Sequence, residues 1–148
     1  MLRSELVSLE VYTDGGALNN GNANGSGVVN CYGSYLVIAV TKDGKQVPVK
    51  HEEKLPMPHL KTNNEAEYQS FINGATYVTN LFDRMGNKPV PVVFKIDSKI
   101  LFDQITGVTK CKAQNLQGFN FLAKEAIRLL EAKMERISGN EMKVILGH

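Results

Sequence analysis

Carboxylates placed where they could act together are the most informative feature of this chain of 148 residues. Asp14 ends the segment VYTD, and Asp97 ends the segment FKID. If these segments are neighbouring parallel strands, both side chains emerge at the carboxyl edge of the sheet, where open α/β sheets place their ligands. Two like charges there repel unless a cation lies between them, and Mg²⁺ or Mn²⁺ prefers oxygen ligands. The structural alternative, in which Asp14 begins a turn and Asp97 caps a helix, stays open.

A third carboxylate comes from the segment TNNEAEY, which holds Glu65 and Glu67. Thr62 and Glu65 fit a capping box, in which each side chain satisfies a backbone N–H at the start of a helix. No such role accounts for Glu67, which falls at the border of the apolar face of that helix. A carboxylate directed toward the sheet is costly without a partner. A metal ion between the two aspartates would be that partner.

The elements before this helix follow from the pattern of apolar residues. LVSLEVYTD alternates and predicts a strand that arrives at Asp14. GGALNNGNANGSG is typical of a loop. YLVIAVTKDGKQVPVK predicts two strands joined at Asp43-Gly44, a strong hairpin signal. HEEKLPMPHL, with two prolines, predicts an irregular connection.

The remaining elements are predicted in the same way. Helical spacing continues from Thr62 to a stop at Gly86, and PVPVVFKID is apolar enough for a central strand. Ser98 can cap a short helix that ends near Gly107. A second long helix has its apolar side at Leu116, Phe119, Leu122, Ala123, Ala126, Leu130 and Ile137. KVILGH is predicted to be the last strand. Together these elements predict one α/β domain over residues 1–148, with helices packed against a mixed sheet.

Composition narrows the classes of partner. A net charge of +2 and a pI near 8.5 permit a polyanionic partner without requiring one. No apolar run approaches the roughly 18 residues of a membrane span, and GNANGSG lacks the G-K-[ST] of a nucleotide-binding loop. Cys31 and Cys111 have no metal-ligand spacing and no export signal precedes them, so we expect reduced thiols and a cytoplasmic protein. His51 and His59 are expected to be surface residues.

Four motifs, YTDGGALNN, TNNEAEY, IDSK and the terminal GH, resemble in order the successive motifs of the ribonuclease H type 1 family. The resemblance runs from about Val11 to His148. It implies the ribonuclease H-like fold, a five-stranded mixed sheet whose first three strands are antiparallel and whose others are parallel, flanked by helices. It also implies a nuclease that cuts the RNA strand of an RNA/DNA hybrid with two Mg²⁺ (or Mn²⁺) ions.

The resemblance assigns roles to individual residues. Asp14, Glu67 and Asp97 match the catalytic metal ligands, and Asp14 is expected to bridge both ions. Hydrolysis would leave a 5′-phosphate and a 3′-hydroxyl, in keeping with two-metal chemistry in which one ion activates water and the other stabilises the leaving oxygen. A monomer is favoured, although the sequence does not determine the oligomeric state.

Substrate contacts are implied at positions that precede or follow these carboxylates. They are Gly15, Asn20, Asn63, Asn64 and Lys99. Amide side chains suit this task because they both donate to and accept from the 2′-hydroxyl that distinguishes RNA from DNA. Alternatively, the paired asparagines belong to a helix start and Asn20 to a loop. Lys99 replaces a glutamine common in the family and only donates. Lys110 and Lys112 are the nearest substitute for a basic protrusion, and are otherwise solvated surface.

The end of the chain departs from the family pattern. His148 matches a family histidine near the scissile phosphate, and the family places a further helix with a fourth metal-binding aspartate after it. We therefore expect the usual C-terminal helix to be missing, with one well-formed metal site and one weak site. Activity would then be reduced or dependent on high Mg²⁺ or Mn²⁺. The alternative function is a non-catalytic or partner-completed nucleic-acid-binding module.

Overall fold

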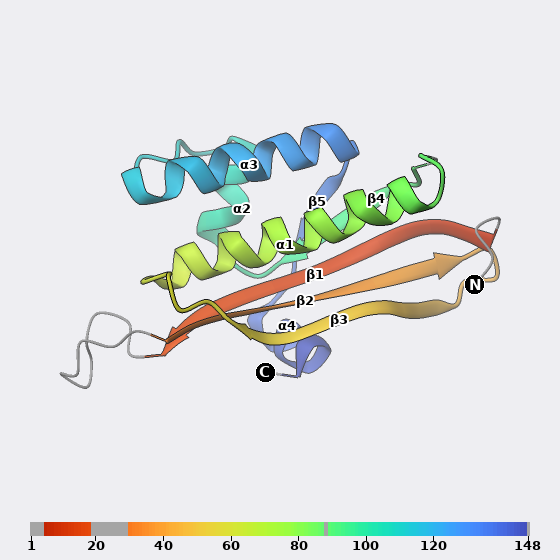
Figure 1. The fold of residues 1–148 in the computed structure, drawn as a ribbon, viewed down its shortest axis with the longest axis horizontal. Coiled ribbons are helices and arrows are strands. Elements are labelled where there is room, and N and C mark those ends of the chain that lie inside the picture. Colours follow the sequence, from red (N-terminus) through yellow and green to blue (C-terminus); the bar gives the residue numbers. More distant parts are fainter. Residues whose placement is uncertain (1–4, 19–29, 88, 148) are drawn as a thin grey trace.

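The computed structural model describes residues 5–18, 30–87 and 89–147. Its elements in chain order are β1 (Leu6–Leu18), β2 (Asn30–Thr41), β3 (Gln46–Pro56), α1 (Asn63–Arg84), β4 (Val92–Ile96), α2 (Lys99–Thr106), α3 (Gln114–Leu130), β5 (Lys133–Arg136) and α4 (Gly139–Leu146). The strands form a five-stranded sheet of order β3-β2-β1-β4-β5. β1, β2 and β3 are antiparallel, whereas β4 and β5 run parallel to β1. The predicted α/β class and mixed sheet are confirmed (Figure 1).

The two faces of the sheet are covered by different helices (Figure 1). Side chains alternate along a strand, so Leu9 and Val11 of β1 face the main core under α1 and α3. Tyr12 faces the other side and packs in a smaller cluster with Met142 and Leu146 of α4. β1 is thus covered on both faces, as expected for a central strand.

The start of α1 is held as the sequence predicts. Thr62 Oγ1 accepts a hydrogen bond from the Glu65 N–H at 3.1 Å, and Glu65 Oε1 accepts one from the Thr62 N–H at 3.0 Å. The capping box is therefore formed in both directions. Two otherwise unsatisfied amide groups are satisfied by side chains, and Glu65 is committed to this role.

A buried polar network joins the three helices on the main-core side. The Tyr68 hydroxyl, on a side chain with 0% exposure, donates to Gln104 Oε1 of α2 at 2.6 Å. It accepts from Asn120 Nδ2 of α3 at 3.0 Å, and the same amide lies 3.3 Å from the Gln104 carbonyl oxygen. Because buried polar groups are costly when unpaired, this network fixes α1 relative to α2.

The first half of the chain has more strand than predicted. β1 continues through Gly15 to Leu18, and β3 extends to Pro56 through the segment assigned to an irregular connection. β3 is an edge strand, where a proline does not have to donate a ladder hydrogen bond. Pro48 lies at a register shift opposite Ile38, which accommodates it. The irregular connection is therefore wrong up to residue 56.

The end of α3 also differs from the prediction. The helix stops at Leu130 because Glu131 adopts a left-handed conformation with φ of 50°, and its N–H donates to the Arg128 carbonyl at 3.2 Å. The chain then forms β5, so Ile137 does not extend the apolar side of the helix. A left-handed C-terminal residue is usually glycine, and the sequence gives no such signal here.

The residues KVIL, at positions 143–146, belong to a helix and not to the predicted strand. β5 is formed earlier, by Lys133–Arg136, and α4 follows after two residues. Ser138 Oγ accepts from the Glu141 N–H at 3.1 Å, and Gly147 ends the helix with φ of 76°. The expectation that no helix follows the last strand is wrong. That residues 1–148 are a single domain stays a prediction.

Two further observations concern the solvent environment. In the described ranges, no helix is both long and apolar enough to cross a membrane. Cys31 is buried, Cys111 is half-buried, and both thiols are free. A cytoplasmic location stays a prediction.

The helical conformation of the C-terminal segment can be tested by two alanine substitutions. On a helix Met142 and Leu146 share the buried face and Val144 points outward, whereas on a strand all three would share one face. Leu146 is 0% exposed and Val144 is 84% exposed. We expect Leu146→Ala to lower the free energy of unfolding by about 2–5 kcal/mol and Val144→Ala to change it by less than about 0.5 kcal/mol. Urea unfolding measures both; equal losses would contradict the helix.

Candidate active site

Asp14 and Asp97 lie at the carboxyl ends of two adjacent parallel strands. β1 pairs with β4 in a register that places Tyr12 opposite Lys95, and Asp97 directly follows β4. Both aspartates are two residues beyond this pair, so they reach the same edge of the sheet. Their side chains lie close enough for Asp97 to raise the pKa of Asp14, by its negative charge and by a side-chain hydrogen bond. The structure thus brings together the two carboxylates as the strand pattern predicts.

Both aspartates are directed to the side of the sheet on which α4 packs. Thr13 faces α1, since its Cγ2 lies 3.1 Å from the position that a Cβ on Gly74 would take. By alternation, Asp14 shares the other side of β1 with Tyr12. The N-terminal end of α4 also lies close to Asp97, because a Cβ on Gly139 would be 3.5 Å from Asp97 Oδ2. A helix N-terminus is a favourable neighbour for a carboxylate.

Glu67 reaches the site because α1 approaches β1 closely at Gly15. A Cβ on Gly15 would lie 2.5 Å from the carbonyl carbon and oxygen of Ala66 and 2.7 Å from the Glu67 nitrogen. No side chain fits there. The absence of a Cβ therefore allows the first turns of α1 to lie against the strand that carries Asp14. Gly15 therefore has a packing role, in addition to the substrate contact that the resemblance implies for it.

The pKa of Asp14 shows how crowded the site is. This pKa is raised from 3.8 to about 7, chiefly by burial and next by the negative charge of Asp97. The N–H of Gly15 and the positive charge of Lys143 act in the opposite direction. Loss of water and a like charge thus outweigh the groups that stabilise the anion.

Glu67 is affected in the same way. Its pKa is raised from 4.5 to about 8, chiefly by burial. A hydrogen bond from Ser98 acts to lower this pKa, and the charges of Asp14 and Asp97 contribute to the increase. The residue is half-buried as a whole, but its Oε2 atom is buried and has no hydrogen-bond partner among the residues that the structure describes. An unpartnered buried carboxylate oxygen is costly, and a cation would remove that cost.

The three residues fit a divalent cation by donor type. All supply carboxylate oxygens, which Mg²⁺ and Mn²⁺ prefer, and Glu67 Oε2 has no hydrogen-bond partner in the described part of the chain. Within the described ranges, however, no three acidic, histidine or cysteine side chains are arranged ready to hold an ion. The carboxylates are neighbours that would have to adjust around a bound metal.

The predicted substrate contacts are placed unevenly. Asn63 Oδ1 accepts from the Ala17 N–H at 2.5 Å, so this side chain ties the start of α1 to the end of β1. Asn64 is half-buried beside it. Asn20 and His148 lie outside the described residues. Lys110 and Lys112 are exposed in the connection between α2 and α3.

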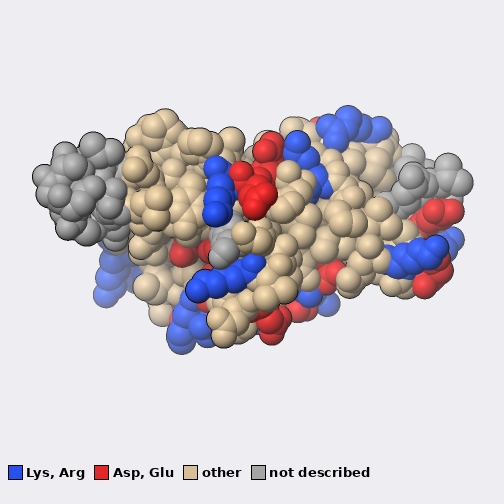
Figure 2. Space-filling model, turned by 90° about the horizontal axis from the view of Figure 1, so that it is seen from below, with Lys and Arg blue, Asp and Glu red and all other residues tan. Residues whose placement is uncertain are grey.

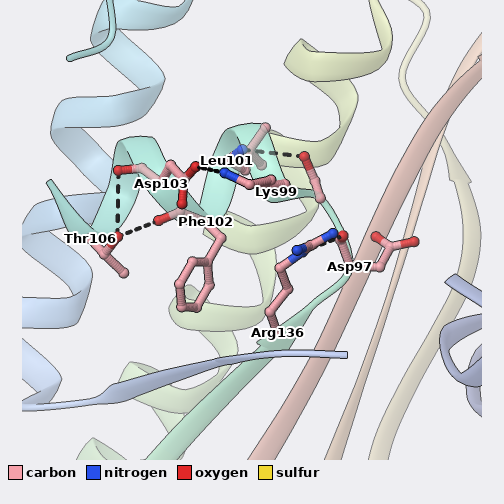
Figure 3. Close-up of polar contacts among 8 residues, drawn as sticks. Asp97, Lys99, Leu101, Phe102, Asp103, Thr106 and Arg136 are labelled. Carbon is pink, nitrogen blue, oxygen red and sulfur yellow. Dashed lines mark hydrogen bonds and ion pairs between the residues drawn. The ribbon is translucent and has the colours of Figure 1, made fainter. Parts of the chain in front are cut away.

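Lys99 points away from the carboxylates. Its Nζ forms an ion pair at 2.5 Å with Asp103 Oδ2, one turn along α2, and its side chain is 68% exposed. Figure 3 shows the Asp97 carboxylate directed away from this pair, while the Arg136 Nε donates to the Asp97 carbonyl oxygen at 3.3 Å. Exposed pairs of this kind contribute little to stability, so Lys99 can exchange Asp103 for another anion.

Comparison with solved structures gives consistent results over almost the whole chain. RNase H1 from the archaeon Halobacterium salinarum has a TM-score of 0.68 at 17% identity, covering 92% of this chain and 89% of that one. The N-terminal RNase H domain of rv2228c from Mycobacterium tuberculosis has a TM-score of 0.69 at 20% identity, covering 93% of this chain and 87% of that one. LC11-RNase H1 in complex with an RNA/DNA hybrid has a TM-score of 0.68 at 19% identity, covering 90% of this chain and 87% of that one.

The chain has the ribonuclease H fold. No protein-family model and no curated protein sequence matches it. At these identities the likeness establishes the architecture and leaves the site residues to be argued from this chain.

Within the ribonuclease H fold, α4 occupies the place expected for a helix after the last strand, but it carries no aspartate. Gly139 and Lys143 are four residues apart and therefore share one side of the helix. Because Gly139 lies beside Asp97, this side faces the carboxylates. Sequence reasoning missed Lys143, because α4 had been assigned to a strand.

Gly15 provides a test of the close approach of α1 to β1. A Cβ there meets backbone atoms of α1, which cannot rotate away, so we expect Gly15→Ala to lower the free energy of unfolding by about 1–3 kcal/mol. Gly118, in α3, has open space around it. Gly118→Ala should instead stabilise the protein by about 0.5–1 kcal/mol. Urea unfolding of both variants checks the pair; a neutral Gly15→Ala would contradict the packing.

The burial of Glu67 predicts a pH dependence of stability in the absence of divalent metal. Glu67 keeps its proton to a pH near 8 when folded, but only to about 4.5 when unfolded. The folded state binds more protons in this window, so the free energy of unfolding falls as pH rises from about 4.5 to about 8. Glu67→Gln should reduce this fall, leaving the part due to Asp14, whose pKa is raised in the same direction.

Glu65→Gln is the matched control for this measurement. Glu65 caps α1, so its replacement should lower stability by about 1 kcal/mol at every pH. Chemical unfolding at several pH values in the presence of a chelator separates the two. A pH profile flattened by Glu65→Gln and unchanged by Glu67→Gln would reverse their assignment.

Proposed function

We propose that this chain is a metal-dependent endoribonuclease that hydrolyses the RNA strand of RNA/DNA hybrids. The observation that carries the proposal is the meeting of Asp14, Asp97 and Glu67 at one edge of a ribonuclease H fold. The Glu67 Oε2 atom is buried there without a hydrogen-bond partner from any residue that the structure describes. A protein that only bound nucleic acid would gain nothing from three carboxylates facing phosphates. The solved complex of LC11-RNase H1 with an RNA/DNA hybrid supports the substrate class.

Asp14, Glu67 and Asp97 would hold the divalent cation, Mg²⁺ or Mn²⁺. When bound, the metal supplies an activated water and charge stabilisation for the leaving oxygen. The products would be a 5′-phosphate and a 3′-hydroxyl. Two ions are the expectation from the resemblance, with Asp14 shared between them.

The residues of the chain contribute position and a prepared charge distribution. The capping box and the Tyr68 network fix α1, Gly15 allows α1 to meet β1, and Ser98 donates to Glu67 while it begins α2. Preorganised charge of this kind is usually the largest contribution to catalysis. Gly15, Asn63 and Asn64 lie beside the cluster, where their N–H and side-chain groups would contact the hybrid. Lys99 points away from the cluster and would contact the hybrid only by exchanging Asp103 for a phosphate.

Cleavage of a hybrid labelled on its RNA strand tests this function. With Mg²⁺ or Mn²⁺ we expect RNA-strand cleavage, and each of Asp14→Asn, Glu67→Gln and Asp97→Asn should reduce the rate by at least about 100-fold. Binding of the hybrid should be retained, because each change removes a negative charge next to phosphates.

Glu65→Gln is the control and should keep most of the activity, because Glu65 caps the helix. If the wild-type protein bound the hybrid but did not cleave it with Mg²⁺ or with Mn²⁺, the proposed enzymatic activity would be wrong. That result would leave the alternative of a non-catalytic or partner-completed nucleic-acid-binding module.

A further inference from the structure

The position of Lys143 follows from how α4 docks. Met142 and Leu146, both 0% exposed, pack with Tyr12 against the side of β1 that also carries Asp14 two residues further on. Lys143 is the neighbour of Met142, and it shares a helix side with Gly139, which lies beside Asp97. The two aspartates and Lys143 therefore meet on one side of the sheet.

Glu141 does not stand in for a fourth carboxylate at this place. It precedes Met142 where Lys143 follows it, so the two charged side chains leave α4 on opposite sides of the buried residue. Glu141 is exposed, and its N–H is used by the Ser138 cap. The charge that α4 presents to the acid cluster is positive, and it acts against the other influences that raise the pKa of Asp14.

Lys143 is free to serve an external anion. Its side chain is exposed at the rim of the cluster, and an ammonium group on a flexible stem is a compact phosphate ligand. On the face in Figure 2, basic side chains are interspersed with acidic ones. A phosphate approaching the carboxylates would therefore depend on a few local cations.

We propose that Lys143 binds a backbone phosphate of the cleaved strand beside Asp14. The inference rests on the proposed function. It identifies Lys143 as a substrate-binding residue, and it implies weaker binding of cations by the substrate-free site, because a positive charge near Asp14 repels them.

The salt dependence of hybrid binding tests the phosphate contact. Each phosphate contact contributes nearly one to the slope of log affinity against log salt. Measured with the full chain in Ca²⁺, so that the hybrid stays intact, Lys143→Met should lower this slope by about one. The loss of affinity between 50 and 200 mM salt would then be about 3-fold smaller than in wild type. Lys143→Arg should keep the wild-type slope.

Lys45→Met is the matched control. Lys45 lies in the turn between β2 and β3 and its side chain is 77% exposed. The register of β1 and β2 places this turn at the end of the sheet opposite to Asp14. The slope of log affinity against log salt for Lys45→Met should equal that of wild type. The thermal midpoints of Lys143→Met, Lys143→Arg and Lys45→Met should all match the wild-type value, because substitutions of exposed residues have small effects on stability.

Mn²⁺ binding to the substrate-free protein is an independent readout. Lys143→Met removes a positive charge that repels Mn²⁺ from the carboxylates. Calorimetry should therefore show Mn²⁺ binding that is about 2- to 10-fold tighter in Lys143→Met and unchanged in Lys45→Met. An unchanged salt slope in Lys143→Met, with the wild-type protein cleaving hybrids, would overturn the inference and leave the function intact. A wild-type protein that neither binds nor cleaves hybrids would overturn both.

Discussion

The close approach of like charges is the constraint on which the site depends. Three carboxylates meet at one edge of the sheet, and the raised pKa values of Asp14 and Glu67 report the cost of keeping them there without a cation. The fold offsets that cost with interactions remote from the charges. The apolar core under α1 and α3, the smaller cluster under α4, and the missing Cβ of Gly15 hold the elements together. A bound cation would relieve the repulsion among the carboxylates, and this relief would contribute to its affinity. Stability and metal binding are therefore linked at this site.

The parts of the fold that were predictable are those in which local chemistry and tertiary packing agree. Thr62 and Glu65 satisfy each other at the start of α1 whatever lies beyond the helix. Ser98 caps α2 by its own hydroxyl, accepting from the Leu101 N–H at 3.2 Å. Apolar runs that ended in Asp14 and Asp97 gave adjacent parallel strands, because strands buried on both faces are recognisable by composition alone. The choice between Glu65 and Glu67 followed from asking which carboxylate already had a backbone partner.

The parts that could not be predicted depend on conformations that the residue types do not favour. Glu131 ends α3 in a left-handed conformation, without the glycine that usually marks such a position. Without that break, the helix pattern runs on to Ile137 and leaves KVILGH as the only remaining strand. KMER has little β propensity, and it forms β5 because β4 offers an unpaired edge, with the Ile137 N–H donating to the Ile96 carbonyl at 2.9 Å. One unsignalled residue therefore displaced both the last strand and the helix after it.

This correction changes the electrostatic account of the site. A chain ending on a strand would leave Asp14 with two neighbouring anions and no helix beside it. The observed α4 brings a helix N-terminus toward Asp97 and an ammonium group toward Asp14, so part of the cluster's negative charge is offset by the protein itself. Lys143 is exposed and loses little hydration there, unlike a buried cation. The arrangement favours a site whose protein charges already suit a phosphate before substrate arrives, with the remaining imbalance centred on Glu67, whose buried Oε2 has no partner among the described residues.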